Sequence, residues 1–343
     1  MRGRGATWNP LNRFETLEYV RDEEAPPDDT SPGTIYLRDP TRTIIATNDS
    51  PDIGFDASIN PYRGCEHGCI YCYARPTHEF LGMSAGLDFE TRIFVKEDAP
   101  ALLREELNAK KWEPKVLVMS GVTDPYQPIE KRLGITRGCL EVLADFRNPV
   151  GVITKNHLIT RDVDVLAELT KYDCAFATIS ITTLDASLAR TMEPRTSTPQ
   201  LRLDAIATLA EAGIPVSVNV APVVPALTDH EMPAILAAAK KAGAKWAGYV
   251  ALRLPWAVAP LFEQWLTENF PDRKDKVLNR VRELRNGKLY DATWGVRGRG
   301  TGIFAEQTAA LFDVTCRKLG LNEDDRDLST AHFRRRTAQA TLF

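Results

Sequence analysis

Short apolar runs alternate with longer amphipathic stretches between about residue 55 and residue 254. The runs are four to six residues long and rich in β-branched side chains, which is typical of strands that are buried on both faces. They cover residues 56–59, 116–119, 150–153, 176–179, 216–220 and 247–252. Six repeats of strand and helix predict a parallel sheet with right-handed crossovers.

The amphipathic stretches carry recognisable helix ends. Thr198 and Pro199 supply an N-cap and a first-turn proline, and apolar residues keep helical spacing from there to Gly213. The next stretch ends in the same way at Gly243. Glycine ends a helix readily because it adopts the left-handed backbone conformation without strain. These signals predict one helix before and one helix after the run at 216–220.

The alternation fits two α/β architectures, a doubly wound sheet and a closed or partly closed barrel. Both place ligands at the carboxyl ends of the strands. We expect an irregular N-terminal arm over 1–54, a barrel over 55–254, and a helical C-terminal extension over 255–343 that packs on the barrel mouth. The acidic, proline-bearing residues 22–29 favour a solvated start to the arm, whereas residues 34–37 could pair as a short strand.

Composition narrows the class of protein. The chain has 343 residues, and its 43 lysines and arginines against 46 acidic residues give a net charge of -3. This balance removes the simplest argument for a nucleic-acid binder, although it leaves room for a local basic patch. No apolar run approaches the roughly 20 residues that a membrane helix needs, and no signal peptide is visible. We therefore expect a cytoplasmic protein without a membrane partner.

Three of the six cysteines lie close together, directly after the first predicted strand. Cys65, Cys69 and Cys72 have the spacing C-x3-C-x2-C, and in a reducing compartment such a group holds a metal more often than a disulfide. Three thiolates on one loop can bind three corners of a cubane iron–sulfur cluster and leave the fourth iron open for chemistry. The alternative is a structural zinc held by the three cysteines with His67 or His78.

The same residues carry a family resemblance. Cys65-x3-Cys69-x-Tyr71-Cys72 resembles the C-x3-C-x-Φ-C signature of radical S-adenosylmethionine (radical SAM) enzymes, in which Φ is an aromatic residue. The resemblance implies a partial (β/α)6 TIM-like barrel and a [4Fe-4S] cluster whose open iron binds S-adenosylmethionine. It further implies reductive cleavage of that cofactor to a 5′-deoxyadenosyl radical, which abstracts hydrogen from a substrate, and an electron donor of the flavodoxin or ferredoxin type.

Within that superfamily the chain resembles the spore photoproduct lyase-like branch over roughly residues 55–225. Tyrosines stand on both sides of the last cluster cysteine in that branch, and Tyr71 and Tyr73 match them. The resemblance implies that Tyr71 lies against the adenine of the cofactor and that the pair relays a hydrogen atom. Tyr71 and Tyr73 are therefore the candidate catalytic residues.

Polar residues at the ends of later strands are similar to the cofactor-binding residues of that branch. Ser120 and Thr123 follow the second strand, where the family directs polar groups to the methionyl part of the cofactor. Lys155 follows the third strand and is similar to the lysine that meets the cofactor carboxylate. Ser180 resembles the serine that contacts the ribose, and Glu193 lies in a stretch similar to the family's Glu-Pro-Gly-Thr.

Each of these residues also has an ordinary structural alternative. Ser180 could cap a helix, Lys155 could be a surface lysine, and Glu193 could form an ion pair with Arg195. The lyases also have a cysteine near the end of the second strand that donates hydrogen to the product radical, and residues 120–124 contain none. The resemblance thus implies the cofactor chemistry and does not extend to repair of thymine dimers.

The sequence therefore predicts a radical SAM enzyme of the lyase or transferase type, with a nucleic acid or a nucleotide as candidate substrate. Over its whole length the chain resembles an uncharacterised bacterial subgroup of radical proteins, in the stretches 60–65, 73–79 and 123–130. The alternative function is an iron–sulfur protein for electron transfer or structure, without turnover. Arg297 and Arg299 alternate with glycines in a manner chemically similar to phosphate-binding loops, but we favour an ordinary surface loop there.

Overall fold

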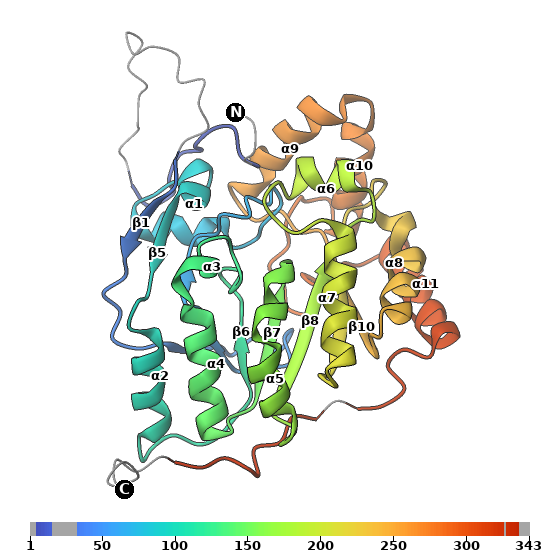
Figure 1. Ribbon diagram of the computed structural model, residues 1–343. Helices are drawn as coiled ribbons and strands as arrows, with labels where there is room; N and C mark the ends of the chain where they lie inside the picture. The colour runs from blue at the N-terminus through green and yellow to red at the C-terminus, as the bar shows by residue number, and fades with distance from the viewer. Residues whose placement is uncertain (1–4, 16–32, 326, 336–343) are drawn as a thin grey trace, which may run out of the picture.

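The computed structural model of this chain describes residues 5–15, 33–325 and 327–335. Its centre is a seven-stranded sheet in which spatial order follows chain order (Figure 1). The strands are β2 (Ile45–Thr47), β3 (Ala57–Ile59), β6 (Leu117–Met119), β7 (Val150–Thr154), β8 (Ala175–Ile181), β9 (Val216–Val223) and β10 (Trp246–Ala251). The six strands from β3 to β10 are parallel, and β2 is antiparallel to β3.

All six predicted strands form, and the sheet does not close, because β10 and β2 are its two edges. The predicted fold, an α/β partial (β/α)6 barrel, is therefore confirmed. The strands are buried on both faces, as their apolar runs predict: in β8 every residue except Thr178 is buried. A short parallel strand between a layer of helices and the barrel interior is buried on both faces. An uninterrupted apolar run is therefore enough to predict it from the sequence.

Helices cover the outer face of the sheet (Figure 1). The crossover helices are α2 (Ala99–Asn108), α3 (Glu130–Leu133), α4 (Ile135–Phe146), α5 (Val163–Thr170), α6 (Ala186–Met192), α7 (Pro199–Glu211) and α8 (Met232–Lys241). Helix α7 begins as predicted, with the Thr198 hydroxyl accepting a hydrogen bond from the Leu201 amide at 3.4 Å. Gly213, just beyond its end, has a φ of 77°. Short 3-10 helices lie at η1 (Arg75–Leu81), η2 (His157–Asp162) and η3 (Asp229–Glu231).

A second, three-stranded sheet lies beside β3. It consists of β1 (Ile35–Arg38), β5 (Arg92–Val95) and β4 (Tyr62–Arg63), with β1 parallel and β4 antiparallel to β5, and α1 (Leu87–Thr91) precedes β5. The short strand expected at 34–37 is therefore formed. The first described residues also pack on the body, since Ala6 is fully buried. The acidic stretch 22–29 lies outside the described residues.

The C-terminal extension is helical, with α9 (Val258–Asn269), α10 (Pro271–Leu284) and α11 (Ile303–Leu319). Figure 1 shows α9 and α10 together with α6 beyond the end of the sheet at which β8 leads into α6. This is the carboxyl end of the parallel strands. Helix α11 packs against α8 at the side of the sheet. Within the described ranges, no helix has both the length and the apolar character needed to cross a membrane.

Candidate active site

The cluster loop, residues 64–75, leaves the short strand β4 and carries the three neighbouring cysteines. Cys65 and Cys69 are each 7% exposed, Cys72 is half-buried, and all three are free thiols. The loop begins with Gly64, whose φ is 79° and whose position a Cβ atom would bring within 2.9 Å of the Phe89 carbonyl. Only glycine fits there, because both the backbone conformation and the close approach exclude a side chain.

A buried arginine hydrogen-bonds to the backbone of the loop. Arg75 donates from Nε and Nη2 to the Cys69 carbonyl at 3.0 and 2.8 Å, and from Nη2 to the Gly68 carbonyl at 3.2 Å. The same guanidinium forms an ion pair with Glu90, and both side chains are fully buried. Glu90 also accepts a hydrogen bond from the Ala6 amide at 2.7 Å. A buried charge survives only when it is paired and hydrogen-bonded, and here that requirement fixes the loop backbone.

A second buried carboxylate ties the loop to distant segments. Glu66 accepts hydrogen bonds from the Thr34 hydroxyl at 3.0 Å, the Tyr36 hydroxyl at 3.2 Å and the Ile129 amide at 3.1 Å. It also forms an ion pair with Arg195 at 2.9 Å. The ion pairs and hydrogen bonds of Arg75 and Glu66 therefore hold the backbone of the loop on which the cysteines lie.

The donor set suits an iron–sulfur cluster. Burial raises the pKa of all three thiols, so thiolates form there only against a compensating positive charge such as iron. Among the residues that the structure describes, no three His, Cys, Asp or Glu side chains converge closely enough to hold one metal ion. The thiolates of a cubane each bind a different iron and need not converge on one ion.

The histidines of the zinc alternative are engaged elsewhere. His67 lies between the first two cysteines, but its Nδ1 is 3.4 Å from Asp124 Oδ2 and its Nε2 is 3.2 Å from Asn156 Nδ2. His78 places Nε2 2.9 Å from the Arg92 carbonyl, and its buried Nδ1 has no hydrogen-bond partner among the described residues. In the part of the chain that the structure describes, neither imidazole lies close enough to the cysteines to complete a zinc site. The residues present therefore fit a cluster with three protein ligands.

Lys155 follows β7 and points into the barrel end. Its Nζ donates to the Ala221 carbonyl at 2.7 Å and to the Thr182 hydroxyl at 3.0 Å, and it lies 3.1 Å from Glu193 Oε1. The side chain is 16% exposed, so the alternative of a surface lysine is wrong. Burial lowers the pKa of Lys155 to about 7. The lysine therefore lies where the carboxyl end of the sheet exposes polar groups, as predicted for a cofactor-binding residue.

Glu193 is the centre of the polar contacts in this part of the site. Its carboxylate accepts hydrogen bonds from Tyr71 and from the Thr182 hydroxyl, the latter at 2.6 Å, and forms an ion pair with the buried Arg202. Burial raises the pKa of Glu193, although Arg202 opposes that shift. Arg195 pairs with the cluster loop instead, so the alternative of a Glu193–Arg195 ion pair is wrong.

The remaining predicted cofactor-binding residues lie around the same strand ends. Ser180 is buried inside β8, where its carbonyl accepts from Arg202 at 3.1 Å, so it does not cap a helix. Thr123 donates from its hydroxyl to the Gly64 carbonyl at 2.6 Å and thereby holds the start of the cluster loop. Ser120 is half-buried directly after β6. Their contacts with a cofactor stay predictions.

The two tyrosines of the loop differ in their surroundings. Tyr71 is buried, and its hydroxyl lies 3.3 Å from the Thr182 hydroxyl in addition to its bond with Glu193. Tyr73 is 47% exposed, and its ring is covered by the guanidinium of Arg253 at 4.1 Å. Tyr71 therefore takes part in the same hydrogen-bond network as Lys155, whereas Tyr73 is exposed and lies next to the end of β10.

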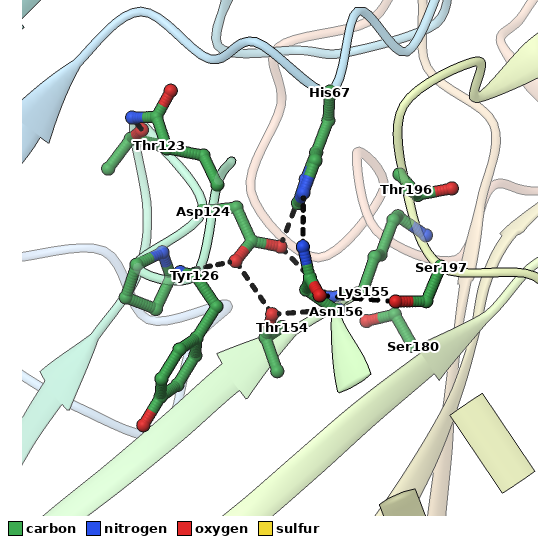
Figure 2. A network of polar contacts seen from close by, with 12 residues as sticks. His67, Thr123, Asp124, Tyr126, Thr154, Lys155, Asn156, Ser180, Thr196 and Ser197 are labelled. Atoms are coloured by element: carbon green, nitrogen blue, oxygen red, sulfur yellow. Dashed lines mark hydrogen bonds and ion pairs between the residues drawn. The ribbon is translucent and has the colours of Figure 1, made fainter. Parts of the chain in front are cut away.

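A further network, which was not predicted, lies between the cluster loop and β7 (Figure 2). Asp124 accepts from the Thr154 hydroxyl at 2.6 Å and from the Lys155 amide at 2.9 Å, and it faces His67. Burial alone would raise the pKa of Asp124, but His67 and the hydrogen bonds hold it below its usual range. Asn156 extends the network by accepting from Ser197 at 3.1 Å.

This network joins the loop to the ends of two strands. His67 and Asp124 are 57 positions apart in the chain, so no periodicity could connect them. The one available signal is their position: each follows a predicted strand, and parallel strands bring their carboxyl ends to one edge. The predicted site residues are therefore gathered at that edge, with the exposed Tyr73 at its outer side.

The family model described as the radical SAM superfamily matches residues 59–239 of this chain. The chain belongs to the radical SAM superfamily. The matched segment runs from the end of β3 into α8 and includes the cluster loop, Lys155 and Glu193. Membership of the radical SAM superfamily supports an enzyme with S-adenosylmethionine-dependent radical chemistry and implies S-adenosylmethionine and a [4Fe-4S] cluster as cofactors.

Curated relatives of this radical SAM protein have no assigned function. An uncharacterized protein of Mycobacterium tuberculosis is 36% identical over 232 residues, which is 67% of each chain. An uncharacterized protein of Methanocaldococcus jannaschii is 31% identical over 173 residues, or 50% of this chain and 62% of that protein. These relatives extend the family but supply no substrate.

Solved structures of spore photoproduct lyase share the fold. The lyase complexed with dinucleoside spore photoproduct has a TM-score of 0.59 and 16% identity, and the match covers 83% of this chain and 80% of that one. A mutant lyase with bound AdoMet and the same dinucleoside has a TM-score of 0.55 and 18% identity, over 83% and 77% of the two chains. At this identity the likeness shows the fold alone, and that fold is the one predicted from the lyase-like motifs.

Proposed function

We propose that this radical SAM protein is an enzyme that holds a [4Fe-4S] cluster on Cys65, Cys69 and Cys72 and uses it to cleave S-adenosylmethionine reductively. Together, the cluster and the cofactor supply a 5′-deoxyadenosyl radical that abstracts hydrogen from a substrate. The observation that carries the proposal is the placement of three free thiols, two buried and one half-buried, on one loop at the carboxyl edge of a parallel sheet. Ligands collect at that edge in such folds.

The residues beside the loop bind the cofactor in this proposal. Lys155 offers its ammonium group to the cofactor carboxylate, and its place at the strand ends, with a side chain that is 16% exposed, supports that role. Tyr71 lies against the adenine, and Glu193 holds both the tyrosine hydroxyl and the lysine ammonium in position. Ser180 contacts the ribose, while Ser120 and Thr123 face the methionyl part.

The substrate approaches from the side of Tyr73. This tyrosine is the exposed member of the pair, and together with Tyr71 it relays a hydrogen atom during turnover. We propose a nucleotide or a nucleic acid as substrate, and spore photoproduct lyase, which shares the fold and has been solved with a dinucleoside bound, supports that class. The reaction is of the lyase or transferase type, and a flavodoxin or a ferredoxin in the cytoplasm supplies the electron.

Anaerobic reconstitution tests the proposal. The protein is loaded with iron and sulfide, reduced with dithionite and incubated with S-adenosylmethionine, and 5′-deoxyadenosine is measured by liquid chromatography and mass spectrometry. We expect a brown protein with about four irons per chain and formation of 5′-deoxyadenosine. Cys69→Ala should abolish both, whereas Cys174→Ala should keep both, because Cys174 is distant from the loop in sequence and bonds only to backbone carbonyls.

Two outcomes would contradict the proposal. A brown, reducible protein that forms no 5′-deoxyadenosine would indicate an iron–sulfur protein without turnover. A protein that keeps its iron after Cys69→Ala and loses it after Cys174→Ala would show that the ligands are different.

A further inference from the structure

A cavity of about 480 Å³ lies beside the ends of β9 and β10. Val223 and Ala251, at the ends of β9 and β10, form one wall, and α10 and α11 form the other with Leu284 and Leu311. Figure 1 shows α11 beside α8 and α10 beyond the end of the sheet, and the two helices contact each other. The volume falls in the range of sites for small molecules, and the apolar residues give it a firm wall.

The polar lining of this cavity is mostly cationic. His230, Lys276, Arg280 and Arg299 contribute basic groups, and Asp229 is the acidic residue among the lining residues. The Asp229 carboxylate accepts hydrogen bonds from two backbone amides of its own turn at 2.9 and 3.0 Å and lies 3.9 Å from His230 Nδ1. Lys276, Arg280 and Arg299 therefore leave the cavity lining with an excess of positive charge over this one carboxylate.

Two of the guanidinium groups are held in place by aromatic rings. Arg299 lies 3.7 Å from the ring centroid of Tyr249, and Arg280 lies 3.3 Å from that of Phe304. Stacking fixes the plane of a guanidinium while its N–H edges stay free to donate. Arg280 has a loose ion pair with Glu283 at 3.4 Å on the exposed side. These arginines are therefore oriented before any ligand arrives.

In the described ranges, Lys276 and Arg299 have no carboxylate partner, whereas His230 lies 3.9 Å from Asp229. Within the described part of the chain, neither Lys276 nor Arg299 forms a hydrogen bond or an ion pair with a carboxylate. The neighbouring Arg297 behaves differently, since it bonds to Asp52 at 2.5 Å and points away from the cavity lining. The loop 297–300 thus has one arginine with a structural partner and one that lines the cavity.

We propose that this cavity binds a phosphate-bearing small molecule of about nucleotide size. Phosphate is the ligand that matches a set of fixed guanidinium donors together with a mobile ammonium, because it offers several charged acceptor oxygens to both. The apolar wall of Leu284, Leu311 and Phe304 receives the uncharged part of the same ligand. None of the proposed cofactor-binding residues is among the residues that line this cavity, so the proposal does not depend on the proposed radical reaction.

Calorimetric titration with ADP tests this site. The anaerobic holoprotein is first saturated with S-adenosylmethionine, so that the adenosine part of ADP cannot enter the cofactor site. We expect ADP to bind and adenosine not to bind, with an affinity for ADP that falls as salt concentration rises. The double substitution Lys276→Ala and Arg299→Ala should weaken ADP binding at least tenfold. Arg273→Ala is the matched control, since Arg273 is an exposed cation of α10 outside the cavity lining.

Two results would overturn the proposal. Equal ADP affinity in the double variant and the parent, or equal binding of ADP and adenosine, would show that these cations do not recognise phosphate. If the double variant unfolds, Lys276→Ala alone decides, because the Lys276 side chain is exposed and has no described partner. A protein that forms 5′-deoxyadenosine but does not bind ADP would remove this site and leave the proposed function intact.

Discussion

Charged residues behave in opposite ways on the two sides of the barrel end. Around the cluster loop, the buried charges of Arg75, Glu66 and Glu193 all have partners of opposite sign. At the cavity beside the ends of β9 and β10, Lys276 and Arg299 have no carboxylate partner among the residues that the structure describes. A buried charge must be paired, and removing one partner is strongly destabilising, so such pairs fix the segment that holds them; an unpaired cation that lines a cavity can still bind a ligand. The paired charges beside the cluster loop stabilise the fold, whereas the unpaired cations of the cavity can bind a ligand.

The largest expected effect comes from breaking the scaffold at Arg75. We expect Arg75→Ala to lower the free energy of unfolding by about 3–5 kcal/mol, because it leaves Glu90 buried without its ion pair and frees the Cys69 carbonyl. Urea unfolding followed by circular dichroism measures the loss. The control is Arg38→Ala, which removes an exposed ion pair with Asp98 and should cost about 1 kcal/mol or less. Equal losses in both variants would contradict the distinction between buried and exposed pairs.

Removing the Lys155 charge should affect the cofactor more than the fold. We expect Lys155→Met to weaken S-adenosylmethionine binding about 10- to 100-fold, the equivalent of about 1.5–3 kcal/mol for a charge-assisted hydrogen bond. The brown chromophore should remain, because the lysine is not a cluster ligand. Equilibrium dialysis with radiolabelled cofactor measures the affinity, and Lys171→Met, on the exposed surface, is the control. An unchanged affinity would assign Lys155 to the scaffold alone.

The hydroxyl groups of Tyr71 and Tyr73 should contribute differently to stability, although both residues lie in one loop. Tyr71→Phe should lower the free energy of unfolding by about 1–2 kcal/mol, because its hydroxyl donates to the buried Glu193. Tyr73→Phe should change that free energy by less than about 0.5 kcal/mol, since the side chain is half-exposed and keeps its ring contact with Arg253. Thermal unfolding of both variants gives the comparison. A larger loss for Tyr73 would place its hydroxyl in the scaffold.

The smallest effect is expected on the open side. Lys276→Ala should leave the free energy of unfolding within about 0.5 kcal/mol of the parent value, because an exposed side chain without a partner contributes no folding interaction. The same urea unfolding used for Arg75 measures it. A loss above about 1 kcal/mol would mean that Lys276 has a structural partner, and the contrast between the two sides would then be wrong.

The sequence alone was enough to predict the fold of this protein and to single out Cys65, Cys69 and Cys72 as candidate cluster ligands. Apolar runs such as 150–153 are strands because a parallel strand buried on both faces has no polar side to show, so local composition is enough. The C-x3-C-x2-C spacing is local as well, since it lies within one loop. Helix ends such as Thr198 and Gly213 depend on backbone geometry over a few residues, and the structure bears them out.

Which charged and polar residues contact each other depends on the tertiary structure. Tyr71 and Glu193 are 122 positions apart, and the ion pair of Glu66 with Arg195 spans 129 positions. An isolated sequence cannot say which acid a given arginine pairs with, because many pairings satisfy the same composition and burial selects among them. The same holds for Arg299: two arginines in one short loop look equivalent in sequence, and packing gave one of them a carboxylate and the other a cavity.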